Sequence, residues 1–123
     1  MSQNKTVVVL GASSNPERYS YKAIALLLEK GYHVIPIHPK EKEIQGIAVK
    51  PDLELVAEPI DTLSIYLRPD KCEPLLAAIL TLKPSRVIMN PGTESDMIEK
   101  ELIEKGIVVV IGCTIVMLKT NQF

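Results

Sequence analysis

Aromatic residues and net charge are both scarce in this chain of 123 residues. It contains no tryptophan, and only 4% of its residues are aromatic, so a base-stacking platform for nucleic acid is not expected. The formal net charge of -1 gives no general attraction to nucleic acid or to anionic membranes. No apolar run approaches the roughly 18 residues of a membrane span, and the polar start, Met1 to Thr6, does not look like a signal peptide. We therefore expect a cytoplasmic protein with no nucleic-acid and no membrane partner.

Cysteine is also rare. The two cysteines, Cys72 and Cys113, form no C-x-x-C pair, and no paired His supports a zinc site, so no metal site is expected. Cys72 is expected to be a small buried side chain in a reducing compartment. For Cys113 two interpretations stay open: a buried side chain, or a side chain at the ligand-binding edge of the sheet.

The chain alternates short apolar runs with helix-like patterns. Its length suits one compact domain, residues 1–123, and its 46% hydrophobic residues suffice for a core. Strands and helices follow from hydrophobic periodicity and from Gly and Pro stops. Strands are expected at Thr6–Leu10, Tyr32–Ile37, Thr62–Leu67, Arg86–Met89 and Ile107–Ile111. Helices are expected at Tyr21–Lys30, Pro74–Leu82 and Asp96–Lys105.

These near-continuous apolar strands indicate a parallel sheet that is covered on both faces. We expect an α/β fold, a Rossmann-like doubly wound five-stranded parallel sheet, with a strand order such as 3-2-1-4-5. Between the strands, Glu41–Ile47 is expected to be a charged connection, and Leu53–Glu58 a short turn or helical piece. From Gly112 onward we expect a loop and a short tail.

The most informative motif is the turn that follows the first strand. Ligands of open parallel sheets bind beyond the carboxyl ends of the strands, and phosphates bind at the helix N-terminus that follows such a turn. Gly11 fills the first position of the G-x-G-x-x-G fingerprint, but Ser13 and Pro16 replace the other two glycines. Arg18 and Lys22 flank the expected helix start. The turn thus predicts a nucleotide-binding relative of the NAD site, although its polar residues also suit helix capping.

The end of the second strand lacks the acidic residue that binds ribose hydroxyls in an NAD site. It carries His38, Pro39 and Lys40, with Lys42 close behind. A basic end suits a phosphorylated ribose, as in NADP or coenzyme A (CoA). The alternative is a solvated loop, because glutamates alternate with these lysines.

Catalytic patterns are scarce. The segment from Gly11 to Asn15 matches the G-x-S-x-G nucleophile elbow only in its first three positions, and the P-loop lysine motif is absent. No catalytic residue is predicted, and an enzymatic activity is not expected.

The chain resembles the small stand-alone CoA-binding proteins, whose fold is like the N-terminal CoA-binding domain of the succinyl-CoA synthetase alpha subunit. The resemblance covers nearly the whole chain. It rests on Gly11-Ala12-Ser13 with Asn15-Pro16, Tyr19 and Lys22, on Gly31-Tyr32-His33-Val34 leading to Pro39, and on Ile44, Gly46, Arg68-Pro69, Pro91-Gly92 and Cys113. Two departures are His38, where relatives often have Asn, and Ile111-Gly112, where they often have a polar or charged pair.

The resemblance implies that CoA lies across the carboxyl edge of the sheet. Its phosphates would meet the turn from Gly11 to Asn15, its adenosine the segment from His38 to Lys42, and its pantetheine Arg68-Pro69 and Pro91-Gly92. Cys113 would then lie near the CoA thiol, where a mixed disulfide is a possible product. The candidate binding residues are Gly11, Ala12, Ser13, Ser14, Asn15, Arg18, Tyr19, Lys22, His38, Pro39, Lys40, Lys42, Arg68, Pro69, Pro91, Gly92 and Cys113.

The expected function is therefore binding of CoA or an acyl-CoA, without catalysis. Two alternatives stay open: an NADP- or NAD-binding oxidoreductase-like protein, and an accessory or regulatory protein that has lost its ligand. The sequence is compatible with a monomer or a homodimer. Because Gly11 permits close approach of a ligand, Gly11→Val is expected to abolish binding while sparing the fold.

Overall fold

The computed structural model describes residues 5–123; residues 1–4, on which part of the signal-peptide argument rests, lie outside the described residues. Within these residues the chain forms seven strands and several short helices. In chain order they are β1 (Thr6–Leu10), α1 (Tyr19–Glu29), β2 (His33–Ile37), β3 (Glu43–Ile44), β4 (Ile47–Ala48), η1 (Leu53–Leu55), β5 (Thr62–Ile65), α2 (Pro69–Cys72), η2 (Glu73–Leu75), α3 (Leu76–Leu82), β6 (Arg86–Met89), α4 (Asp96–Glu104), β7 (Val108–Ile111) and α5 (Thr114–Lys119).

Five of these strands form one parallel sheet with the order β2-β1-β5-β6-β7. The α/β Rossmann-like fold with a five-stranded parallel sheet is thus confirmed, but the order 3-2-1-4-5 is wrong. The third strand of this sheet along the chain, β5, pairs with β1 and not with β2. Lys50 bonds to the outer edge of β2, and the Asp61 N–H, just before β5, bonds to the Thr6 carbonyl at the start of β1. The strand order therefore reverses between β1 and β5, where such folds bind ligands.

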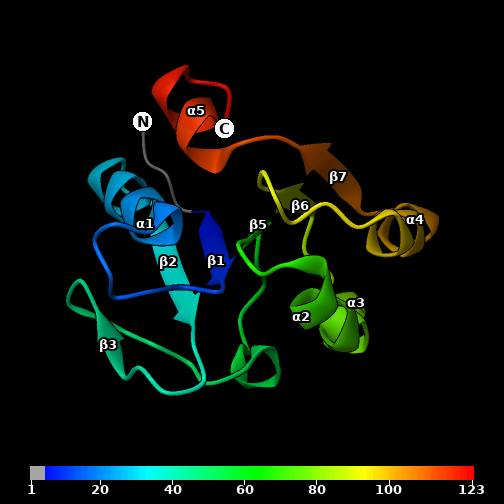
Figure 1. Ribbon diagram of the computed structural model, residues 1–123, viewed down its shortest axis with the longest axis horizontal. Helices are drawn as coiled ribbons and strands as arrows, with labels where there is room; N and C mark the ends of the chain where they lie inside the picture. Colours follow the sequence, from blue (N-terminus) through cyan, green and yellow to red (C-terminus); the bar gives the residue numbers. More distant parts are fainter. Residues whose placement is uncertain (1–4) are drawn as a thin grey trace.

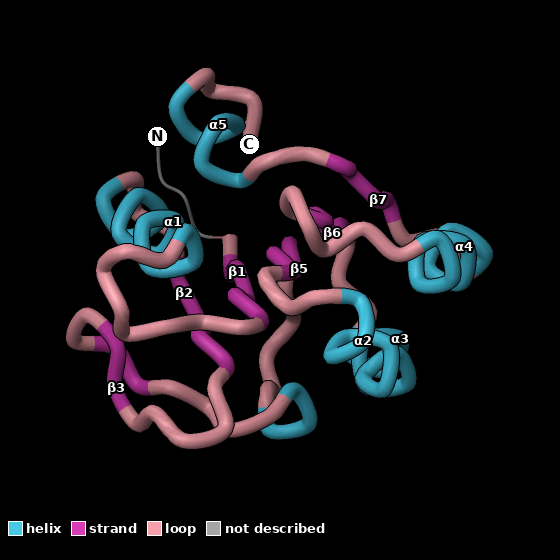
Figure 2. The backbone as a smooth tube through the Cα atoms, viewed as in Figure 1, coloured by secondary structure: helices cyan, strands magenta, loops and turns pink. Residues whose placement is uncertain are grey.

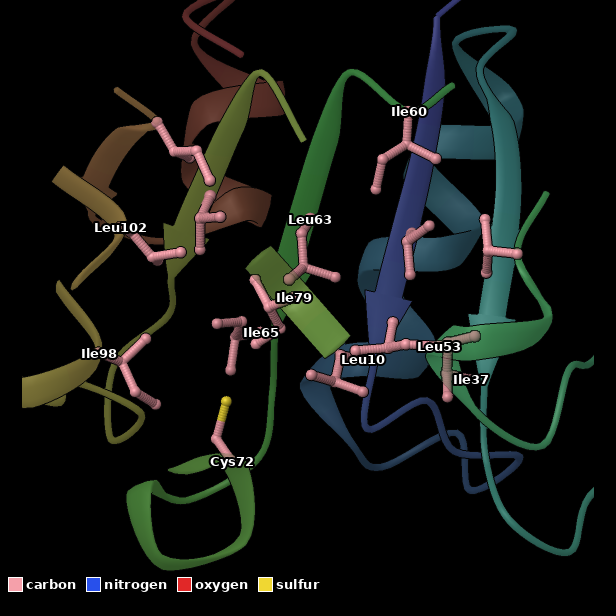
Figure 3. Packing of buried hydrophobic residues seen from close by; sticks show 14 of the residues in the cluster. Leu10, Ile37, Leu53, Ile60, Leu63, Ile65, Cys72, Ile79, Ile98 and Leu102 are labelled. Carbon is pink, nitrogen blue, oxygen red and sulfur yellow. The ribbon is translucent and has the colours of Figure 1, made fainter. Parts of the chain in front are cut away.

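Helices cover both faces of the sheet, as Figure 1 shows. α1 and α5 lie on one face, where Val7 and Val9 of β1 pack with Ile24 and Leu118. On the other face, η1, α3 and α4 cover Val8 and Leu10 of β1 and their neighbours; Figure 3 shows part of this cluster. Successive residues of β1 alternate between the two clusters, which explains why Val7 to Leu10 are all apolar. Cys72 is buried in the second cluster, as expected.

Three segments differ from the expectations. Glu41–Ile47 contains the start of a hairpin, β3–β4, whose tight turn places Gln45 and Gly46 at positive φ. The expected helix at Pro74–Leu82 is divided into η2 and α3, and α2 precedes them. The expected tail after Gly112 contains α5, which is too short to show a helical period and is held by burial of Leu118. Among residues 5–123, none of the helices has the length and apolar character needed to cross a bilayer.

Candidate functional site

A cavity of about 880 Å³ opens at the carboxyl edge of the sheet, beside the reversal of strand order. Its wall combines the loop after β1, the end of β2, the segment around η1, and the residues that follow β5 and β6. Figure 2 shows the loop after β1 running from that strand past β2 to the start of α1. The lining residues are Leu10, Gly11, Ala12, Ser13, Glu17, Arg18, Tyr19, Ser20, Ile37, His38, Pro39, Pro51, Asp52, Leu53, Tyr66, Leu67, Lys71, Leu75, Pro91 and Thr93.

One part of the cavity wall is apolar. Leu10 ends β1, Ile37 ends β2, and Leu53 of η1 packs against them in one buried cluster. Figure 3 shows these three side chains close together. They are almost fully buried, so the cavity wall here is fixed by the hydrophobic core and suits an apolar part of a ligand.

The loop after β1 is held by its own polar side chains. The Ser13 hydroxyl accepts a hydrogen bond from the Asn15 N–H at 3.0 Å, and the Asn15 side-chain oxygen accepts one from the Glu17 N–H at 2.9 Å. Neither side chain caps α1, whose N-cap residue, Arg18, makes no side-chain capping bond either. The first-turn N–H groups of α1 therefore remain available to an anion, which the helix dipole also favours.

Gly11 allows the loop to turn tightly against the end of β5. Its φ is +89°, and an added Cβ would lie 3.0 Å from a Leu67 side-chain carbon and 3.1 Å from the Tyr66 carbonyl carbon. Both features disfavour any side chain at this position. The expectation that Gly11→Val spares the fold is therefore wrong.

His38 organises the loop after β2. Its Nδ1 accepts hydrogen bonds from the N–H groups of Lys40 and Glu41, both at 3.0 Å, so its ring proton is on Nε2. An Asn side-chain oxygen, which the family resemblance implies at this position, would accept the same kind of hydrogen bond. The Ser14 hydroxyl donates to the Glu41 carboxylate and joins this loop to the loop after β1.

Charged side chains of both signs line the cavity. Arg18 and Lys71 contribute positive charge, whereas Glu17 and Asp52 contribute negative charge. One Asp52 oxygen already accepts a hydrogen bond from the Glu54 N–H at the start of η1. The charges nearly balance, so the N-terminus of α1 is the feature that favours an anion at this site.

A buried polar cluster lies near the ends of β5 and β6. The Asn90 side-chain amide donates to the Ser64 hydroxyl at 3.0 Å and to the Ile65 carbonyl at 2.8 Å, and its oxygen accepts from the Thr114 N–H. The Ser64 and Thr114 hydroxyls are 2.8 Å apart. The cluster thus fixes the start of α5 to the central strands.

The buried Tyr66 hydroxyl, beside this cluster, has no hydrogen-bond partner among the described residues. Burial raises the pKa of Tyr66 to about 12; the nearby Thr114 and Ser64 hydroxyls, as hydrogen-bond donors, lower it, and the nearby Cys113 raises it, each by less than burial does. Tyr66 is therefore a neutral residue. Its hydroxyl lies near the Thr114 and Ser64 hydroxyls but meets neither with hydrogen-bond geometry, so its lost hydration is poorly replaced.

Removal of this hydroxyl is expected to cost no stability. Tyr66→Phe should leave the free energy of unfolding unchanged or raise it by up to about 1 kcal/mol, because an unpaired buried hydroxyl is lost. Ser64→Ala is the control, because it removes a bonded hydroxyl and should lower stability by about 1–2 kcal/mol. Urea unfolding measures both variants. An equal loss in the two would show that the Tyr66 hydroxyl is bonded.

Eight of the sequence-predicted residues line the cavity, and nine lie outside its lining. Those in the lining are Gly11, Ala12, Ser13, Arg18, Tyr19, His38, Pro39 and Pro91. Those outside are Ser14, Asn15, Lys22, Lys40, Lys42, Arg68, Pro69, Gly92 and Cys113.

Several of the outer residues have specific neighbours. The Arg68 guanidinium lies 3.2 Å from the Asp70 carboxylate, and the Lys22 amine lies 5.5 Å from the centre of the Tyr19 ring. Cys113 is half-buried at the N-cap of α5, near Tyr66.

Sequence reasoning missed the cavity residues that come from connections. Asp52 and Leu53 lie in the segment before β5, and Lys71 and Leu75 lie in the helical turns after it. For Lys71 a signal was present, because it stands two residues after Pro69, which starts a helix directly beyond a strand end. For Asp52 and Leu53 no local signal marks their approach to the cavity.

Known proteins share this architecture. One crystal structure of an uncharacterized protein is 40% identical and covers 98% of both chains with a TM-score of 0.92. A Thermus thermophilus protein of known structure is 32% identical, with a TM-score of 0.90, and the match covers 98% of this chain and 92% of that one.

A larger enzyme contains the same fold as one of its parts. The dinucleotide-forming acetyl-coenzyme A synthetase 1 of Ca. Korarchaeum cryptofilum matches 89% of this chain with 26% of its own, at 22% identity and a TM-score of 0.74. The family model described as CoA binding domain matches residues 5–119, which is nearly the whole chain. The chain therefore belongs to the CoA binding domain family.

Proposed function

We propose that the protein binds CoA or a CoA thioester in this cavity and catalyses no reaction on it. The observation that carries the proposal is the combination of an apolar wall with the uncapped start of α1 in a single cavity of about 880 Å³. CoA requires both, because its phosphates need donors and its adenine and pantetheine need apolar surface. Membership of the CoA binding domain family supports the same ligand.

The ligand's phosphates would lie at the loop after β1. There the first-turn N–H groups of α1 and the Arg18 guanidinium offer donors, and Lys71 offers a second cation in the same lining. We place the adenosine near His38 and the pantetheine toward Pro91, in the order that the family resemblance implies. Leu10, Ile37 and Leu53 would then contact the apolar parts of the ligand.

The end of β2 favours a phosphorylated ribose. An NAD site has an acidic residue there, whereas this chain has His38, whose Nδ1 is occupied by two backbone N–H groups. Lys40 and Lys42 are exposed in the following loop. They lie outside the lining but directly follow His38 and Pro39, which belong to it, and this position suits a group at the outer end of the ligand, such as the 3′-phosphate of CoA.

Native mass spectrometry of the freshly purified protein tests the proposal. We expect a retained mass equal to that of CoA or an acyl-CoA, or saturable uptake of added CoA where the protein is purified empty. Retention of NADP would favour the oxidoreductase-like alternative. An empty protein that fails to take up either compound would contradict the proposal and favour the accessory protein that has lost its ligand.

CoA is expected to bind more tightly than dephospho-CoA. A charge-assisted contact of Lys40 or Lys42 with the 3′-phosphate contributes roughly 1.5–3 kcal/mol, which corresponds to about 10- to 150-fold in affinity. Titration calorimetry with both ligands measures the ratio. The double variant Lys40→Ala, Lys42→Ala should bring it close to one, whereas Lys83→Ala, Lys100→Ala should leave it unchanged. Equal affinities in the unmodified protein would show that this loop does not contact the ligand.

A further inference from the structure

A second cavity, of about 210 Å³, lies at the amino edge of the sheet and is lined by Lys5, Tyr32, Asp61, Arg86 and Phe123. Lys5, Tyr32 and Asp61 each stand directly before a strand, and Arg86 begins β6. Because β1, β2, β5 and β6 run parallel, their amino ends meet at this edge, and Figure 1 shows the C-terminus on the same side. The second cavity is therefore separate from the first one, which opens at the carboxyl edge.

Arg86 is held in place by its neighbours but uses only part of its hydrogen-bonding capacity. Its Nε and Nη2 groups both donate to the Thr62 hydroxyl oxygen, at 3.1 and 2.9 Å. Thr62 is fully buried, and its hydroxyl donates to the Asp61 carboxylate at 2.7 Å, so this acceptor is fixed. A guanidinium has five N–H groups. The other three meet no protein acceptor within residues 5–123 and can bond to a ligand.

The side chains around the second cavity carry an excess of positive charge. Arg86 has no carboxylate within 4.0 Å in the part of the chain that the structure describes. The Asp61 carboxylate, which accepts from Thr62, lies 4.0 Å from the amine of the exposed Lys5. The lining thus has two cations and one carboxylate, although the whole chain has a net charge of -1. A half-buried guanidinium without a counter-ion of its own favours an anion in contact with it.

Two aromatic rings form the apolar part of the lining. The centre of the Phe123 ring lies 4.5 Å from Cζ of Arg86, and the Tyr32 ring meets the Phe123 ring at 5.1 Å between centroids in an edge-on arrangement. The Phe123 ring shields one face of the guanidinium from water, which strengthens its interaction with an anion. The lining therefore suits a ligand that joins a negative group to an apolar body.

We infer that the second cavity binds a small organic monocarboxylate. The carboxylate accepts hydrogen bonds from the remaining N–H groups of Arg86, whose planar arrangement matches two carboxylate oxygens, and Lys5 supplies a second cation. The apolar body lies against the rings of Phe123 and Tyr32. The volume of about 210 Å³ is below the roughly 300–1,000 Å³ of sites for drug-sized ligands, so the ligand is small.

Asp61 selects against ligands with more than one negative charge. A monoanion neutralises the single excess positive charge of the lining, whereas a second negative charge is repelled by the Asp61 carboxylate. The same repulsion, together with the small volume, excludes CoA with its several phosphate charges. The inference is therefore independent of the ligand proposed for the first cavity.

Titration with benzoate, followed by NMR of the ¹⁵N-labelled protein, tests the site. Benzoate should cause saturable shifts at the amides of Asp61, Arg86 and Phe123 and none at Gly11 or Leu53, which line the first cavity. Benzamide has the same ring without the charge, so it should bind at least about tenfold more weakly. Phenyl phosphate, a dianion at about pH 8, should also bind at least about tenfold more weakly, and Asp61→Asn should reduce that difference.

Substitutions in the lining separate the charge from its geometry. Arg86→Gln should raise the benzoate dissociation constant at least about tenfold, and Arg86→Lys, which keeps the charge but not the planar donors, should have a smaller effect. Lys5→Gln should raise it about two- to fivefold, because Lys5 is exposed. Lys100→Gln is the control, because it removes the same charge from an exposed position on α4 outside the lining and should leave the affinity unchanged.

Circular dichroism shows whether each variant is folded. Where Arg86→Gln is not, Lys5→Gln and the comparison with benzamide decide the question, since neither changes a buried residue. Absence of saturable shifts at tens of millimolar benzoate would overturn the inference. Benzamide or phenyl phosphate binding as tightly as benzoate would also overturn it, as would a benzoate affinity that Arg86→Gln and Lys5→Gln both leave unchanged.

Discussion

Charge reversal at Arg18 is expected to weaken CoA binding by about 100-fold or more. Arg18 is the N-cap residue of α1 and lines the cavity, where we place the ligand's phosphates. Loss of a charge-assisted contact costs roughly 1.5–3 kcal/mol, and the glutamate in Arg18→Glu adds repulsion to that loss. Titration calorimetry of the purified variant with CoA measures the affinity.

The opposite end of the same helix provides a matched control. Lys30 is exposed at the C-cap of α1, so Lys30→Glu makes the same change in net charge far from the cavity. It should alter CoA affinity less than about twofold, because exposed charges beyond a Debye length of ~10 Å are screened. Arg18 is exposed, so both variants should unfold at nearly the temperature of the unmodified protein. Equal losses of affinity in the two variants would place the phosphates elsewhere.

Gly11→Val is expected to be the most destabilising single change at the site. Valine at positive φ costs about 1–3 kcal/mol, and crowding against Leu67 and the Tyr66 backbone adds about 1–3 kcal/mol. In a domain of this size each kcal/mol lowers the melting temperature by roughly 3–6 °C, so we expect a fall of about 10 °C or more. Thermal unfolding followed by circular dichroism measures it.

A substitution at Gly106 distinguishes the cost of a positive φ from the cost of crowding. Its φ is +80°, close to the +89° of Gly11, but an added Cβ would have no atom within 4 Å. Gly106→Ala should therefore cost only the conformational part, about 1–2 kcal/mol, and Gly11→Ala should cost more. Equal losses in the two alanine variants would contradict the crowding at Gly11.

The central strands were predictable because they are buried on both faces, whereas β7, with Val108 and Ile111 exposed, was recognisable only as a run of β-branched residues. Val7, Val8 and Val9 are all fully buried, so a run of β-branched residues with no polar alternation identifies β1 from the sequence. The strand order was not predictable in the same way. It depends on where Lys50 and Asp61 hydrogen-bond, and those contacts form only when distant segments pack.

The residues of the candidate site also fall into two groups: those that a local motif identifies and those that tertiary packing brings to the cavity. The loop after β1 was identifiable because its Gly, Ser, Asn and Pro residues mark a tight turn between a strand and a helix. Leu53 and Lys71 come from connections whose positions depend on tertiary packing. Only Lys71, two residues after Pro69, has a local signal that places it beyond a strand end. α5 was missed for a related reason, because Leu118 stabilises it through contacts with distant residues.

The central claim is that CoA binds at the carboxyl edge of the sheet, and an NMR titration tests it most directly. In a ¹⁵N-labelled sample, CoA should cause saturable shifts in the amides of Gly11, Arg18, His38, Leu53 and Lys71. A smaller cavity of about 210 Å³ at another place, lined by Lys5, Tyr32, Asp61, Arg86 and Phe123, should remain unperturbed. Saturable shifts confined to that second cavity, or no shifts at millimolar CoA, would contradict the account.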